Sequence, residues 1–197
     1  DAQESRGLGD VYKRQDVDGV LTDGMLYYGP DGDAMKGFSA RDGMGVSLAR
    51  MAGIKTCIVT GRLSPMVERR AADLHIDYVL QNISDKEKAL ETLCHQHNVS
   101  FADIAYMGDD LNDVAVISRA RYGGAPCDGC LEARQHADFV SHYAGGHGAL
   151  REFIESILKD QGVWPHLLEK FKAGSADFTP VSYTLLRAHE TPEHLVC

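Results

Sequence analysis

Short apolar runs and segments with helical spacing alternate through the middle of this chain. The runs rich in apolar and β-branched residues lie at 56–59, 77–80, 104–107 and 138–140. The segments with helical spacing lie at 65–74, 84–94, 111–118 and 150–158. This alternation favours an α/β fold built on a doubly wound, Rossmann-like parallel sheet. Such sheets bind their ligands at the carboxyl ends of the strands, so we expect the functional residues there.

Local signals indicate where two of the helices begin. Ser64 is placed as an N-cap, with Pro65 at the first helical position. Ser84 and Glu87 have the spacing of a capping box, which predicts a second helix start beside Lys86.

One segment departs from the alternation and indicates a β-hairpin. Residues 25–28 and 33–38 flank the sequence Gly29-Pro30-Asp31-Gly32. Proline, aspartate and glycine each favour a tight turn for a separate conformational reason. We therefore expect a hairpin flap near the start of the sheet.

Acidic, hydroxyl and basic side chains follow the strand-like runs in a fixed order. The order is Asp16 and Asp18, then Thr60, then Lys86, then Asp109. A carboxylate that attacks a phosphate dianion meets charge repulsion unless a cation lies between them. Mg²⁺ prefers carboxylate and phosphate oxygens as ligands. The order therefore predicts Mg²⁺-dependent phosphoryl transfer, with Asp16, Asp18 and Asp109 at the metal.

The same residues suggest a division of catalytic roles. Asp16 is expected to attack phosphorus, and Asp18 to act as general acid and then general base. Thr60 is expected to donate a hydrogen bond to a phosphoryl oxygen, and Lys86 to supply positive charge. Gly61 keeps a backbone amide open to the phosphate.

The charge and the apolar pattern limit the possible partners. Twenty basic residues against 29 acidic ones give a net charge of −9, which repels nucleic acid and anionic membranes. No apolar run approaches the roughly 18 residues of a membrane span. The N-terminus lacks the apolar segment of a secretion signal. We expect a cytoplasmic protein whose partner is a small molecule.

The cysteines fit the same compartment. Five scattered cysteines suggest reduced thiols rather than a disulfide framework. Cys127 and Cys130 have the spacing of a metal or redox pair, but no second pair follows, and we expect them to be loop residues. Gly145-Gly146-His147-Gly148 lacks the lysine of a P-loop. We expect it to position the chain before a helix, beside the active site of a neighbouring subunit.

Taken together, these motifs resemble those of the haloacid dehalogenase superfamily. They also look like the branch of the 3-deoxy-D-manno-octulosonate 8-phosphate phosphatases. The matching runs are 16–24, Arg41-Asp42-Gly43-Met44-Gly45, Thr60-Gly61-Arg62, Ser84-Asp85-Lys86, Gly108-Asp109-Asp110 and 144–152. The stretches between Asp16, Thr60 and Lys86 leave no room for a cap domain, which needs about 50 residues.

The resemblance implies a sugar-acid phosphate as substrate and a homotetramer in which a neighbouring subunit covers each site. Leu26, Tyr27 and Tyr28 of the hairpin would then lie in an interface, the alternative being an ordinary exposed hairpin. Arginine binds carboxylates through two hydrogen bonds. Arg62 is the first candidate for the substrate carboxylate, and Arg41, Arg69 and Arg151 are weaker ones.

Two other functions stay open. One is hydrolysis of a nine-carbon keto-sugar acid 9-phosphate by the same chemistry. The other is a catalytically weak oligomerisation domain, like the phosphatase-like domains fused to some acylneuraminate cytidylyltransferases. The intact set of Asp16, Asp18, Thr60, Lys86 and Asp109 favours an enzyme.

The ends of the chain fit the family pattern less well than the middle. We expect an atypical segment at 1–15, which does not supply an apolar strand before Asp16 and suggests a foreign N-terminus. Residues 16–172 are expected to form the phosphatase domain, and 173–197 a loosely ordered tail. Residues 121–126 also depart from the apolar strand expected there.

Overall fold

The computed structural model describes residues 12–15, 19–30 and 32–174. In this part of the chain, six parallel strands form one sheet in the order β5-β4-β1-β6-β7-β8. The strands are β1 (Tyr12–Gln15), β4 (Thr56–Val59), β5 (Tyr78–Leu80), β6 (Ile104–Met107), β7 (Tyr122–Ala125) and β8 (Phe139–Val140). The order reverses at β1, so the prediction of a doubly wound parallel sheet is confirmed.

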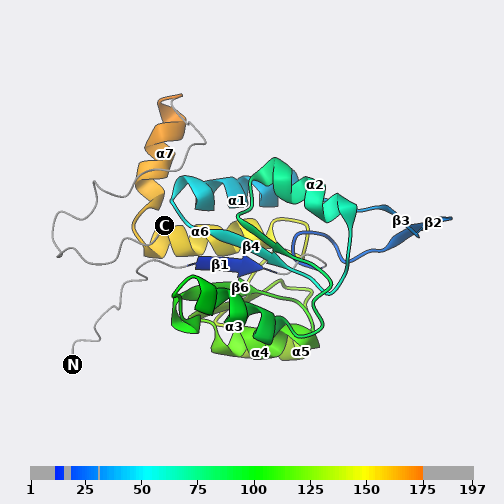
Figure 1. Cartoon of the computed structure of the whole chain (residues 1–197). Coiled ribbons are helices and arrows are strands. Elements are labelled where there is room, and N and C mark those ends of the chain that lie inside the picture. Colours follow the sequence, from blue (N-terminus) through cyan, green and yellow to red (C-terminus); the bar gives the residue numbers. More distant parts are fainter. Residues whose placement is uncertain (1–11, 16–18, 31, 175–197) are drawn as a thin grey trace.

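Helices cover both faces of the sheet (Figure 1). One face carries α1 (Ala40–Met51), α2 (Pro65–Leu74) and α6 (Ala149–Asp160). The other carries α3 (Lys86–Gln96), α4 (Val114–Arg119) and α5 (Leu131–His136). The helix α7 (Trp164–Lys172) follows α6 and contributes Leu167 to the core. None of the described helices is long and apolar enough to cross a membrane.

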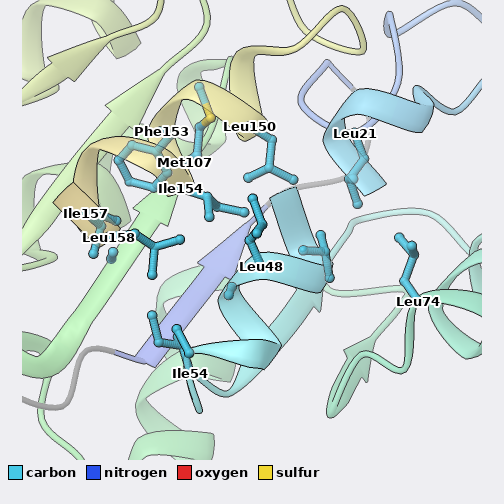
Figure 2. Close-up of a cluster of buried hydrophobic side chains, with 14 of the residues drawn as sticks. Leu21, Leu48, Ile54, Leu74, Met107, Leu150, Phe153, Ile154, Ile157 and Leu158 are labelled. Carbon is cyan, nitrogen blue, oxygen red and sulfur yellow. The ribbon is translucent and has the colours of Figure 1, made fainter. Parts of the chain in front are cut away.

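The larger core cluster lies between the sheet and the layer of α1, α2 and α6. The apolar residues of α6 recur at helical spacing, and each is at most 1% exposed: Leu150, Phe153, Ile154, Ile157 and Leu158. Figure 2 shows them pointing toward Leu48 of α1 and Met107 of β6. Gly45 lets α1 approach α6 closely, because a Cβ at Gly45 would lie 3.0 Å from the Cα of Arg151.

The sequence interpretation of residues 1–15 needs one correction. Residues 12–15 form β1, at the centre of the sheet, although they are not apolar. Gln15 pairs with Met107 of β6 and Ile58 of β4, so backbone hydrogen bonds to both neighbours define this strand. Tertiary context here overrides local strand propensity. Similarly, residues 122–125 form β7 despite Gly123 and Gly124, because these glycines admit close contacts from Ile117 and Phe153.

The hairpin is confirmed as β2 (Tyr27–Gly29) and β3 (Gly32–Met35), an antiparallel pair that projects from the body (Figure 1). In the described part of the chain, only this hairpin and α1 lie between β1 and β4, and only α2 and β5 lie between β4 and α3. The fold is therefore the expected core without a cap domain. Most of the predicted tail, residues 175–197, lies outside the described residues.

Two helix starts differ from the prediction, and that of α2 agrees with it. Asp85, and not Ser84, caps α3, because its Oδ1 accepts a hydrogen bond from the backbone N–H of Lys88 at 2.9 Å. Ser64 is the N-cap residue of α2, but its hydroxyl makes no capping bond. The predicted helix at 111–118 is divided into a 3₁₀ turn, Leu111–Asp113, and α4.

Candidate active site at the carboxyl edge of the sheet

The loops that follow β1 and β6 meet at the carboxyl edge of the sheet. Gly19 has a φ of 82°, and a Cβ added there would lie 2.0 Å from Oδ2 of Asp109. The Asp109 carboxylate therefore lies directly against the backbone of the first loop. Asp16 and Asp18, the predicted nucleophile and acid, lie outside the described residues. The structure thus brings the ends of the two acidic motifs together without describing those two side chains.

Asp113 connects the predicted lysine to the Asp109 loop. Its Oδ1 accepts hydrogen bonds from Nζ of Lys86 at 2.8 Å and from the hydroxyl of Tyr106 at 2.5 Å. Its Oδ2 accepts from the backbone N–H groups of Asp109 and Asp110, each at 3.2 Å. The side chains of Lys86 and Asp113 are 2% and 0% exposed. This buried network holds Lys86 and the Asp109 backbone in one arrangement.

Sequence reasoning assigned no role to Asp113 or Tyr106. The spacing Gly108-Asp109-Asp110 followed by Asp113 was a usable signal, because a residue three positions after Asp110 in a helical turn lies beside it. Gly108 supports this geometry, because a Cβ there would lie 2.4 Å from the Cβ of Asp113.

Thr60 and Gly61 lie at the carboxyl end of β4, as predicted. Thr60 is 2% exposed, and its backbone N–H donates to the carbonyl of Leu80 at 2.8 Å. Its hydroxyl oxygen accepts from the N–H of Arg62 at 3.2 Å. Arg62 is exposed, and its Nη1 donates to the hydroxyl of Tyr28 at 3.5 Å. This contact joins the hairpin to the loop that carries Thr60.

The structure groups Arg41 and Arg151 in a cleft of about 220 Å³ that also involves Tyr143, His147 and Glu155. Thr60, Lys86 and Asp109 do not line this cleft. Nε of Arg151 donates to Oε1 of Glu155 at 2.5 Å, so this guanidinium already has a carboxylate partner. Of the predicted substrate arginines, Arg62 thus lies in the Thr60 loop, whereas Arg41 and Arg151 line this cleft. Arg69 is exposed on α2 and does not line the cleft.

A further loop, residues 141–148, supports the first acidic loop from within the same chain. The backbone N–H of Gly146 donates to the carbonyl of Val20 at 2.9 Å. A Cβ at Gly145 would lie 1.8 Å from the carbonyl oxygen of Gly19. This glycine-rich segment leads directly into α6, as predicted. The expectation that it lies beside the active site of a neighbouring subunit stays a prediction.

The segment around Cys127 and Cys130 completes the same edge. The N–H of Cys130 donates to the carbonyl of Asp109 at 2.7 Å, and Oδ1 of Asp128 accepts from the N–H of Gly145 at 2.9 Å. Within residues 19–174, excluding 31, no three His, Cys, Asp or Glu side chains form a metal site. Both cysteines are free thiols, and Cys130 is the N-cap residue of α5.

Asp109 fits the predicted magnesium site in its chemistry. It presents hard carboxylate oxygens beside the turn at Gly19, where Asp16 and Asp18 directly precede that glycine in the sequence. Its backbone N–H and carbonyl are bonded to Asp113 and to Cys130, so the main chain that carries the carboxylate is held in place. Asp16, Asp18 and Asp109 stay the predicted ligands of the ion, and of these the structure describes Asp109.

Comparison with known proteins identifies the family. A model of the haloacid dehalogenase-like hydrolases matches residues 77–153. The 3-deoxy-D-manno-octulosonate 8-phosphate phosphatase KdsC of Salmonella typhi is 40% identical over 147 residues, which is 75% of this chain and 78% of that protein. The protein of the same name from Escherichia coli K12 is 39% identical over the same lengths.

Solved structures extend the likeness to the fold. A 3-deoxy-D-manno-octulosonate 8-phosphate phosphatase from Moraxella catarrhalis, in complex with a magnesium ion, a phosphate ion and KDO, matches with a TM-score of 0.81 and 35% identity. That match covers 85% of this chain and 97% of the other. A cobalt-bound phosphatase of this kind from Haemophilus influenzae matches with a TM-score of 0.75 and 37% identity, over 79% and 91% of the two chains. The chain therefore belongs to the haloacid dehalogenase-like hydrolases, in the branch of the 3-deoxy-D-manno-octulosonate 8-phosphate phosphatases.

Proposed function

We propose that this chain is a Mg²⁺-dependent phosphatase that hydrolyses 3-deoxy-D-manno-octulosonate 8-phosphate. The observation that carries the proposal is the contact of Gly19 with the Asp109 carboxylate, beside the buried pair of Lys86 and Asp113. Relatives that are about 40% identical carry the name of this activity, and one solved relative holds magnesium, phosphate and KDO.

The proposed reaction proceeds in two displacements. An Asp16 oxygen forms a bond to phosphorus while the bond to the sugar oxygen breaks, and Asp18 gives its proton to the leaving sugar alkoxide. A water molecule then attacks the aspartyl-phosphate, Asp18 takes its proton, and inorganic phosphate and free Asp16 are released. Bound Mg²⁺ would neutralise phosphate charge, so that a carboxylate can approach phosphorus.

The remaining residues of the site stabilise and orient the phosphoryl group. The Lys86 ammonium offsets the negative charge that develops on the phosphoryl oxygens. Asp113 fixes the position of that ammonium through its 2.8 Å bond. The hydroxyl of Thr60 and the backbone N–H of Gly61 are the proposed hydrogen-bond donors at the end of β4.

The sugar carboxylate is assigned to Arg62. This side chain is exposed beside the Thr60 loop, and its Nη1 donates a long hydrogen bond of 3.5 Å to the neutral hydroxyl of Tyr28. A guanidinium can bind a carboxylate through two parallel hydrogen bonds. Arg41 and Arg151 are the second choice, because their cleft also contains Glu152 and Glu155.

The proposed assembly is a homotetramer in which hairpins associate and a neighbouring subunit covers each site. The hairpin region exposes large apolar side chains: Met25 is 57%, Tyr28 67% and Met35 55% exposed. Apolar surface gathered on a projecting flap is typical of an interaction site. Sedimentation of wild type against a Tyr28→Ser, Met35→Ser variant tests this, since a fully active wild-type monomer would contradict it.

We also propose a cytoplasmic location, which fits the free thiols of the four described cysteines.

A panel of phosphate esters tests the function. Purified protein is assayed for phosphate release from the eight-carbon 8-phosphate, a nine-carbon keto-sugar acid 9-phosphate and an aryl phosphate, each with Mg²⁺ and with a chelator. We expect the highest kcat/KM with the eight-carbon ester and no turnover with the chelator. A higher kcat/KM with the nine-carbon ester would change the substrate assignment to that ester. Absence of turnover with all three esters would favour the catalytically weak oligomerisation domain.

A further inference from the structure

Asp42 is a fully buried carboxylate that lies outside the set of predicted catalytic residues. It is 0% exposed and belongs to the first turn of α1. Its Oδ2 accepts a hydrogen bond from the N–H of Gly148, and its Oδ1 accepts one from the N–H of Arg151, each at 3.0 Å. Both donors belong to the beginning of α6, more than 100 positions further along the chain.

The start of α6 needs this external acceptor. The first N–H groups of a helix have no partner within it. The N-cap residue of α6 is Gly148, with a φ of 116°, and it has no side chain to accept them. Asp42 supplies the missing cap from another helix. Burial raises the pKa of Asp42, although the N–H groups of Arg151, Gly148 and Leu150 favour its ionised form.

The residues just before α6 lead directly to the active site. Gly146 donates from its N–H to the carbonyl of Val20 at 2.9 Å, and Gly145 has no room for a Cβ against Gly19. Gly19 in turn lies against the carboxylate of Asp109. A continuous series of contacts therefore runs from Asp42 through the glycine-rich loop to the loop that follows β1.

We propose that Asp42 is a positioning residue for the phosphatase reaction, holding the glycine-rich loop at 144–148 against the loop at 19–23. A misplacement of about 1 Å at a reacting group can cost up to about a hundredfold in rate. The inference rests on the proposed function, since the loop at 19–23 continues the segment that contains Asp16 and Asp18.

Asp42→Asn is the most informative variant. Asparagine has the same shape, but it offers one acceptor oxygen and turns an N–H₂ group toward a backbone donor. We expect kcat to fall by about tenfold or more, with KM for the sugar-acid phosphate changed less than about twofold. Hydrogen exchange of the amides at 19–23 and 144–148 should become faster.

Asp77→Asn is the matched control. Oδ2 of Asp77 accepts from the N–H of Thr56 at 2.8 Å, so this carboxylate also joins two elements, but at the amino edge of the sheet. We expect Asp77→Asn to lower Tm and to leave kcat and the exchange at 19–23 unchanged. Ser39→Ala is a milder way to weaken the contact between Asp42 and the start of α6. The hydroxyl of Ser39 accepts a hydrogen bond from the N–H of Asp42 at 3.3 Å, and it also bonds to the Asp42 carboxylate.

The outcomes separate the positioning role from a structural one. The inference is overturned if Asp42→Asn lowers Tm but keeps the kcat of wild type, or if Asp77→Asn loses as much activity. If Asp42→Asn does not fold, Ser39→Ala decides, with a smaller fall in kcat expected and an unchanged kcat counting against the proposal. Hydrogen exchange is measured without turnover. A wild-type protein that hydrolyses none of the esters would therefore refute the proposed function, while exchange of the amides at 19–23 and 144–148 would still test whether Asp42 holds the two loops together.

Discussion

The buried pair of Lys86 and Asp113 offers the most quantitative test of the site. The two side chains are 2% and 0% exposed and 2.8 Å apart, so water screens their attraction little. Removing one partner of such a pair costs about 3–5 kcal/mol. Asp113→Asn keeps an oxygen for other donors, and Lys86 retains further contacts, so we expect the lower end, about 3 kcal/mol, for either single variant.

That loss corresponds to a fall in Tm of about 6–12 °C for a chain of this length. The assay is a double-mutant cycle by urea unfolding, with Lys86→Met, Asp113→Asn and the double variant. Since the second substitution removes a group that has already lost its partner, we expect a coupling of about 2–3 kcal/mol.

The matched control is the exposed pair of Lys172 and Glu169, whose side chains are 68% and 70% exposed at a similar distance of 2.8 Å. Exposed pairs couple weakly, so Lys172→Met and Glu169→Gln should couple by less than about 0.5 kcal/mol. The reasoning is refuted if the buried pair couples no more strongly than the exposed one.

Three further predictions concern single positions. Gly19→Ala should abolish most turnover, because its Cβ would meet the Asp109 carboxylate. Gly162→Ala, at φ 69° with open space around it, should cost only the strain of a left-handed backbone, about 1 kcal/mol, and leave the kinetics unchanged. Tyr106→Phe should lower the free energy of unfolding, measured in urea, by about 1.5–3 kcal/mol, because its hydroxyl loses a hydrogen bond to the buried carboxylate of Asp113. Tyr122→Phe is the control, since its partner is the neutral Ser156, and it should cost about 1 kcal/mol or less. Although burial alone would raise the pKa of Glu152, hydrogen bonds from Ser141 and His142 hold it below its ordinary value of 4.5. A lowered pKa means that the ionised Glu152 stabilises the fold above pH 4.5, and that this stabilisation is lost as pH falls through the native pKa. Glu152→Gln should therefore reduce the fall of Tm with falling pH, and an unchanged dependence of Tm on pH would contradict this role of Glu152.

The periodic parts of the fold were predictable from the sequence. The bounds of α2 agree at both ends, and the apolar spacing of residues 150–158 identifies the buried face of α6. The order of Thr60, Lys86 and Asp109 was enough to place all three near strand ends, because parallel strands present their carboxyl ends at one edge.

What could not be predicted depends on contacts between distant segments. β1 is defined by pairing on both sides and not by its own residues. The hydrogen bond between Asp42 and Gly148 connects α1 to the start of α6, and no local sequence pattern predicts such a bond. The roles of Asp16 and Asp18, and the domain boundaries at 15 and 172, stay predictions.

The most direct test of the account is to find the covalent phosphoryl group. Wild-type protein with Mg²⁺ and 3-deoxy-D-manno-octulosonate 8-phosphate is quenched in acid during turnover, digested and mapped by mass spectrometry. We predict a phosphorylated peptide that contains Asp16, absent from Asp16→Asn, which should fold and show no turnover. A phosphoryl group on another residue, or full turnover by Asp16→Asn, would contradict the account.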